Sequence, residues 1–135
     1  MRKKYALALL LLTSCAPGHQ LEELRAKKPT GENFNQVLAA EYLAYAESLA
    51  EEGHPIRMNR YAAKGLDALA GEDVSPAENK ELDENRAALM AVLTPDVKEI
   101  APAKAARAQL LYDCWGHQRM QKAADPVSCE EEFRS

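Results

Sequence analysis

Three cysteines are the side chains of this 135-residue sequence best able to do chemistry. Cys15 lies three positions after the end of an apolar run near the start, whereas Cys114 and Cys129 lie 15 residues apart near the end. A thiol can carry a lipid, join a second thiol in a disulfide or, as the thiolate, bind a metal ion. Which of these applies depends on the compartment in which the chain folds and on the elements that position each sulfur.

The first 14 residues have the pattern of an export signal. Residues 2–4 are basic, and residues 5–12 form an uncharged apolar run. That run is too short for a transmembrane helix, which needs about 20 apolar residues, but it is typical of a secretory leader. The usual small-x-small cleavage pattern does not follow it. The segment Leu12–Cys15 instead resembles the bacterial lipobox, in which the cysteine receives a diacylglycerol before the leader is removed.

The lipobox resemblance predicts a domain organisation and a location. Residues 1–14 are expected to be the lipoprotein signal peptide, residues 15–32 the lipidated cysteine with a flexible tether, and residues 33–135 the helical domain. A short helical stretch is expected within the tether at Leu21–Leu24. Several acyl chains hold a protein firmly on a membrane where one does not. Ala16 follows the cysteine, and a non-acidic residue there implies sorting to the outer membrane, facing the periplasm. The competing interpretation is a leader in which Cys15 carries no lipid.

Export also decides between the uses open to the other two cysteines. With Cys15 acylated, Cys114 and Cys129 remain, and two thiols in an oxidising compartment are expected to pair. Closing a loop of that size stabilises a fold by roughly 3 kcal/mol in the chain-entropy model. The alternative is a metal site, because Cys114 and His117 have a Cys-x-x-His spacing. The other two histidines are distant in sequence, so the disulfide is favoured and no metal or cofactor is predicted.

Composition and charge exclude several classes of function. Charged residues make up 28% of the chain and hydrophobic residues 47%, which is typical of one globular domain rather than a multi-span membrane protein. The formal charge is −4, and loss of residues 1–14 would leave 14 basic residues against 21 acidic ones. Nucleic acid is not an expected partner, because phosphate binding needs clustered Lys and Arg. No nucleophile–base pair or triad context appears, so no enzyme activity is predicted.

Apolar periodicity predicts an all-α fold, a small helical bundle built on an αα-hairpin. Between Asn33 and Glu52, apolar residues recur at the 3.6-residue period of an amphipathic helix, and Gly53 suits its C-terminal cap. A second helix is expected over residues 56–69, with small residues where the two helices would cross. The pair is similar to a single tetratricopeptide-type unit, but no second copy follows at a 34-residue period.

The rest of the chain predicts three more helices and a disulfide-closed C-terminal segment. Val92 and Ile100 are expected to point into the core. Pro102 is expected to shorten or kink the helix in which it lies. These helices are expected from an N-cap at Ser75 to Leu93, from Pro95 toward Ala123, and from Asp125–Pro126 over Cys129 and Phe133.

Three further features allow a functional and a structural interpretation, and the structural one is favoured each time. Trp115 could be a ligand platform, but beside a cysteine it is expected to be buried against the disulfide. Tyr42, Tyr45 and Tyr61 could line a groove for a partner helix, but they are expected in the core. Glu130–Glu132 could bind a partner, but three acids near a helix start are expected to be a solvated first turn.

Several short motifs are spread over the predicted helical domain. They include Asn33–Gln36, Glu41–Leu43, Tyr61–Leu66, Gly71–Val74 with Pro76, Ala105–Ala108, Asp113–Trp115, and the late Cys129 with Phe133. Together these motifs resemble the N-terminal helical region of OmpA-family outer-membrane lipoproteins. The resemblance covers nearly the whole mature chain, and the family's own cysteine pair supports a bridge between Cys114 and Cys129.

The resemblance also has a limit. Family members usually continue into a peptidoglycan-binding domain, and the wall-binding Asp and Arg of that domain have no counterpart here, so no direct peptidoglycan-binding motif carries over. The sequence therefore predicts an outer-membrane lipoprotein, a membrane-tethered helical structural or interaction module without catalytic activity. Its expected partners are membrane lipid, through acylated Cys15, and another envelope protein. The alternative is a soluble periplasmic helical adaptor that binds a protein or peptide.

Overall fold

The computed structural model describes residues 19–121 and 128–135. Every regular element within them is helical, which confirms the predicted all-α class, and none of these helices is both long and apolar enough to span a bilayer. The predicted leader, Cys15 and the expected helix start at Asp125–Pro126 lie outside the described residues. The α-helices are α1 (His19–Lys27), α2 (Phe34–Glu51), α3 (Pro55–Leu69), α4 (Asp83–Val92), α5 (Pro95–Ile100), α6 (Pro102–Gln121) and α7 (Cys129–Arg134), with a 3₁₀ turn at Lys80–Leu82 before α4.

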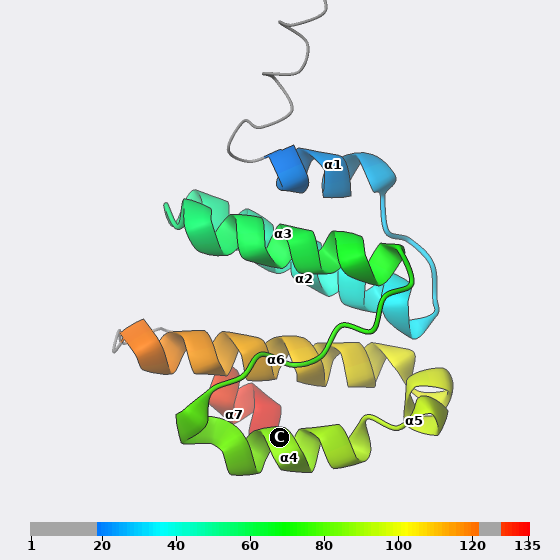
Figure 1. The fold of residues 1–135 in the computed structure, drawn as a ribbon, viewed down its shortest axis with the longest axis vertical. Coiled ribbons are helices and arrows are strands. Elements are labelled where there is room, and N and C mark those ends of the chain that lie inside the picture. Colours follow the sequence, from blue (N-terminus) through cyan, green and yellow to red (C-terminus); the bar gives the residue numbers. More distant parts are fainter. Residues whose placement is uncertain (1–18, 122–127) are drawn as a thin grey trace, which may run out of the picture.

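Helices α2 and α3 form the predicted αα-hairpin (Figure 1). Asn33 caps the start of α2, where its side chain accepts a hydrogen bond from the Gln36 N–H at 2.9 Å. At the other end of α2, Gly53 has a φ of 81°, and the N–H groups of Gly53 and His54 bond back to the last turn. Glycine adopts this left-handed conformation without strain, so the predicted C-terminal cap is confirmed.

The other helices stack around this hairpin. Figure 1 shows the hairpin between α1 on one side and α6 on the other, with α4 and α7 beyond α6. Tyr42 and Tyr61 are buried and Tyr45 is half-buried, so the tyrosines belong to the core as predicted. The side chains that close the centre of the core come mainly from α2, α3 and α6 and include Leu38, Tyr42, Ala46, Leu49, Met58, Ala62, Ala106, Leu110 and Trp115.

Helix α1 belongs to the folded body, although the sequence placed it within a flexible tether over residues 15–32. Leu21 and Leu24 are buried and hold α1 against the hairpin. At Gly65 of α3, a Cβ atom would lie only 2.6 Å from a methyl group of Leu24, so the missing side chain lets the two helices approach. The short helical stretch expected at Leu21–Leu24 is confirmed, but two leucines in a polar segment do not indicate that this helix packs on the hairpin.

The predicted helix start at Ser75 is wrong. Residues 72–79 have no regular structure, and α4 begins later in the chain. The Ala77 N–H donates to the Asp113 carboxylate at 2.7 Å, so this backbone is bonded to a buried side chain of α6 instead of to its own next turn. A capping pattern describes only local preference, and the long-range hydrogen bond overrides it.

The predictions for the middle of the chain are confirmed in part. Pro102 begins α6, and the chain breaks between α5 and α6 as its position indicated. Val92 and Ile100 were expected to point inward, but they are 59% and 83% exposed. Each is the last residue of a short helix, and no neighbouring described element covers its side chain.

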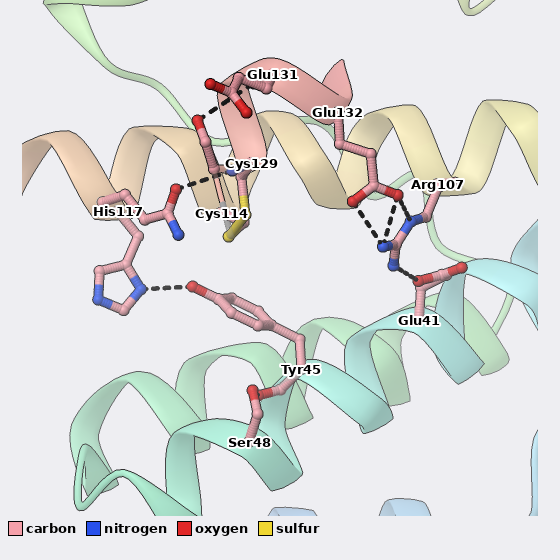
Figure 2. The surroundings of a disulfide bond; sticks show 11 residues. Glu41, Tyr45, Ser48, Arg107, Cys114, His117, Cys129, Glu131 and Glu132 are labelled. Carbon is pink, nitrogen blue, oxygen red and sulfur yellow. Dashed lines mark hydrogen bonds and ion pairs between the residues drawn. A yellow bond between two sulfur atoms is a disulfide. The ribbon is translucent and has the colours of Figure 1, made fainter. Parts of the chain in front are cut away.

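A disulfide joins Cys114 of α6 to Cys129 of α7, as predicted, with the two Cα atoms 5.9 Å apart (Figure 2). Ser128 caps α7 by accepting a hydrogen bond from the Glu131 N–H at 3.3 Å. Trp115 is buried in the core, and its ring lies 5.6 Å from that of Phe133. The bond and the ring contact together fasten α7 to α6.

The acidic first turn of α7 also reaches the hairpin. In Figure 2, Arg107 lies between Glu132 of α7 and Glu41 of α2, with ion-pair distances of 2.9 Å and 3.0 Å. Arg107 and Glu132 are exposed, and exposed ion pairs contribute little to stability. The covalent bond is therefore the main restraint on α7.

Changing Cys114 to Ser is expected to lower the free energy of unfolding by about 2–4 kcal/mol, because the unfolded chain loses its cross-link. Urea titration followed by circular dichroism measures the change, and the same loss is expected when the wild-type protein is reduced. A Cys114→Ser protein that unfolds at the same urea concentration as the oxidised wild type would contradict a stabilising bond.

Candidate functional site

Of the predicted site residues, the structure describes Cys114 and Cys129. Cys15 lies outside the described residues. Cys114 is bonded to Cys129 and so does not form the Cys-x-x-His ligand pair with His117 that the sequence left open. Residues 19–121 and 128–135 contain no group of three or more His, Cys, Asp or Glu side chains placed to hold a metal ion.

The structure instead gathers polar side chains in the core around Asp113 of α6. The side chain of Asp113 has no exposed surface. Its carboxylate accepts hydrogen bonds from the Tyr42 hydroxyl at 2.7 Å and from the Ala77 N–H at 2.7 Å, and the Lys64 ammonium lies 2.8 Å from it. A carboxylate is stable in such a place only when it is paired and hydrogen-bonded. One side chain thus joins α2, α3, α6 and the segment before α4.

Gln109, one helical turn before Asp113, extends this cluster. Its amide nitrogen donates to the Val74 carbonyl at 2.8 Å and contacts the Tyr42 hydroxyl at 3.1 Å. Gln109 is fully buried, and its bond to Val74 gives the irregular segment a second attachment to α6. This pair of attachments explains how residues 72–79, most of which are exposed or half-buried, stay fixed to α6 without helical hydrogen bonds of their own.

The charge of Asp113 sets the electrostatics around it. Lys64 is 18% exposed, and its ammonium lies 5.0 Å and 5.5 Å from the ring centroids of Tyr42 and Tyr61. Both rings therefore present their faces to a cation. Burial first, and then the negative charge of Asp113, raise the pKa of Tyr42 and of Tyr61 well above that of a free phenol.

His117, one turn beyond Asp113, continues the polar row formed by Gln109 and Asp113 on α6 toward the surface. The Tyr45 hydroxyl lies 2.5 Å from Nδ1 of His117, as Figure 2 shows, and a guanidinium nitrogen of Arg57 contacts Nε2. A guanidinium can only donate, so Nε2 is the acceptor in this contact. His117 thereby orients Arg57, which comes from the first turns of α3.

Two adjoining clefts open where α3 begins and α6 ends. The inner cleft has a volume of about 80 Å³, and Asp113 and His117 form part of its wall. The outer cleft has a volume of about 450 Å³, within the range typical of small-ligand sites. Arg57, Arg60 and Met120 line both, and His54 and Ile56 complete the wall of the outer one.

Sequence reasoning missed the cluster, although a signal was present. Gln109, Asp113 and His117 follow one another at intervals of four in α6, and the residues between them carry no charge. That spacing places all three on one face, and three polar groups on a buried face must find partners. The partners themselves, among them Lys64 and Ala77, could not be read from the sequence because they are distant along the chain.

The two parts of this site have different chemical capacities. Asp113 is engaged by three donors, and its role in this structure is to hold elements together. Arg57 and Arg60 form no ion pair with a carboxylate of the described residues, whereas four other arginines there do. Two of the three described arginines without a carboxylate partner therefore line the same clefts.

Replacing Asp113 with Asn is expected to lower the free energy of unfolding by about 3–5 kcal/mol, because the Lys64 ammonium would remain nearly buried without a counter-charge. Chemical denaturation measures the loss. The double variant Asp113→Asn with Lys64→Met is the control, and it should recover part of the stability because both charges are gone. If the loss in the double variant equals the sum of the losses in Asp113→Asn and Lys64→Met measured separately, the two side chains do not interact.

Stability is also expected to fall as the pH rises above about 10, where the phenols of the unfolded chain ionise. The raised pKa values of Tyr42 and Tyr61 keep these phenols protonated in the folded state, so their contribution is complete below that pH and is lost above it. Tyr61→Phe keeps the ring and should flatten the alkaline decline in urea midpoint. An unchanged decline would rule out Tyr61 as a contributor.

No known protein-family model, curated protein or solved structure matches this chain. The resemblance to the helical region of OmpA-family lipoproteins accordingly stays a prediction that rests on the short motifs quoted above.

Proposed function

We propose that this protein is a lipid-anchored helical module of the Gram-negative cell envelope. In this proposal Cys15 carries the lipid, the helical body faces the periplasm from the outer membrane, and the module acts by binding another envelope protein without catalysing a reaction. Three lines of support are independent of one another: the disulfide, the leader, and the distribution of bonded and available polar groups.

The disulfide between Cys114 and Cys129 is the observation that carries the proposal. Disulfides persist in oxidising compartments such as the bacterial periplasm and are rare in the cytosol. Both sulfurs belong to the folded body, and Cys129 is the first residue of α7, so the bond is part of the architecture. This supports export, and it leaves Cys15 as the cysteine available for a lipid.

The start of α1 adds a geometric consequence. Only residues 16–18 separate Cys15 from His19, the first residue of a helix that packs on the core. At about 3.4 Å per residue, four steps span at most roughly 14 Å. A lipid on Cys15 would therefore hold the helical body close to the membrane surface, where it meets other envelope proteins.

The polar groups of the fold support an interaction role. The buried carboxylate, Asp113, is engaged within the core, whereas the clefts beside Arg57 and Arg60 are open and carry charge without carboxylate partners. Open, charged concave surface is suited to recognise a partner.

Lipidation is tested by labelling cells with a palmitate analogue and measuring the intact mass of the membrane-extracted protein. The native protein is expected to carry label, to begin at an acylated Cys15 and to partition with membranes. Cys15→Ser should abolish the label and the partitioning, whereas the control variant Cys114→Ser/Cys129→Ser should keep the label. Unchanged partitioning of Cys15→Ser would favour the soluble periplasmic adaptor instead.

A further inference from the structure

The outer cleft combines charged and apolar side chains in its wall. Arg57 and Arg60 contribute guanidinium groups from one side of α3. Ile56 and Met120 border the same cleft and are 78% and 66% exposed, among the most exposed large apolar residues described. Large apolar side chains left open beside charge mark surfaces that bind a ligand with both characters.

No carboxylate of the described residues forms an ion pair with the arginines of this cleft, although Glu78 lines the adjoining inner cleft beside them. His54 has Glu52 at 3.8 Å, and the charge of Asp113 in the inner cleft is matched by Lys64. Arg57 and Arg60 have no such carboxylate. Of the described arginines, Arg57, Arg60 and Arg86 form no ion pair with a carboxylate, and Arg57 and Arg60 are the two that line the same cleft.

One of these arginines is also held in place. Arg57 contacts Nε2 of His117, and His117 is fixed in turn by Tyr45 of α2. A guanidinium that is already oriented loses less entropy when it binds an oxyanion, and its planar fork matches a carboxylate with two parallel hydrogen bonds.

The start of α3 also favours binding of an anion at this cleft. Its N-cap residue, His54, makes no side-chain cap hydrogen bond, and Pro55 follows it at the first helical position. The first-turn N–H groups of this 15-residue helix carry the partial positive charge of its dipole. This adds to the two arginines at the mouth of the same cleft.

We propose that the outer cleft binds the free carboxylate end of a polypeptide whose last side chains are apolar. Arg57 and Arg60 receive the carboxylate, and Ile56 and Met120 pack against the terminal side chains. The volume of about 450 Å³ accommodates a short chain end and not a folded surface. The inference deepens the proposed function, since it gives the interaction module a recognition site, but the cleft does not depend on Cys15.

The test uses the full chain, oxidised and labelled with ¹⁵N and ¹³C, in nonionic detergent micelles. The probes are N-acetylated Ala-Ala-Leu-Leu with a free carboxylate, the same peptide as its C-terminal amide, and inorganic phosphate. Arginine Nε–H and methionine and isoleucine methyl NMR signals report binding at the cleft. The free-acid peptide is expected to shift the signals of Arg57, Arg60, Ile56 and Met120.

Arg60→Gln should weaken binding of the free-acid peptide by about tenfold, which corresponds to one charge-assisted hydrogen bond. Arg60 is exposed and has no partner in the core, so the variant should keep the fold, as its circular dichroism would show. Arg119→Gln is the matched control: it removes one exposed arginine that pairs with Glu81 and does not line the cleft.

Each remaining outcome would overturn the inference. Equal affinity for the acid and the amide would exclude the carboxylate as the recognised group. Phosphate that binds as tightly as the free-acid peptide would show that the apolar wall adds nothing. Equal weakening by Arg119→Gln, or no shift with any probe, would remove the cleft as the site. None of these results bears on acylation of Cys15, which the intact mass of the protein tests separately.

Discussion

The fold depends on the ion pair between Asp113 and Lys64 inside the core. Removing two charges from water is costly, and the cost is offset here because the carboxylate also accepts hydrogen bonds from Tyr42 and Ala77. These partners belong to α2, α3 and the irregular segment before α4. The pair therefore favours this arrangement of the elements, because separating them would leave a buried charge without its partners.

Successive turns of helix α6 bind different parts of the fold. Gln109 and Asp113 fix the irregular segment and the hairpin, and His117, one turn further, orients Arg57 at the clefts. On the side that faces α7, Cys114 attaches the last helix covalently. One helix thus presents a polar row to the core and a sulfur to α7. The geometry of the clefts is consequently coupled to the stability of the core, because His117 and Asp113 share a helix.

The proposed anchoring and the proposed recognition site place different requirements on the chain. Anchoring depends on residues before α1 and on a short connection to His19. Recognition depends on side chains where α3 begins and α6 ends, which the core positions whether or not a lipid is present. A module of this kind would hold the start of α1 at a short, covalently limited distance from the membrane.

The sequence by itself determined the helical class, the αα-hairpin with its glycine cap at Gly53, the break at Pro102 and the pairing of Cys114 with Cys129. All of these follow from local preference, from periodicity or from the count of thiols. Only the tertiary structure decided that residues 19–27 dock on the core and that residues 72–79 stay irregular. The physical reason is that both depend on contacts between residues distant along the chain. Leu24 meets the missing side chain of Gly65, and Ala77 donates to Asp113, so neither outcome can be derived from a local pattern.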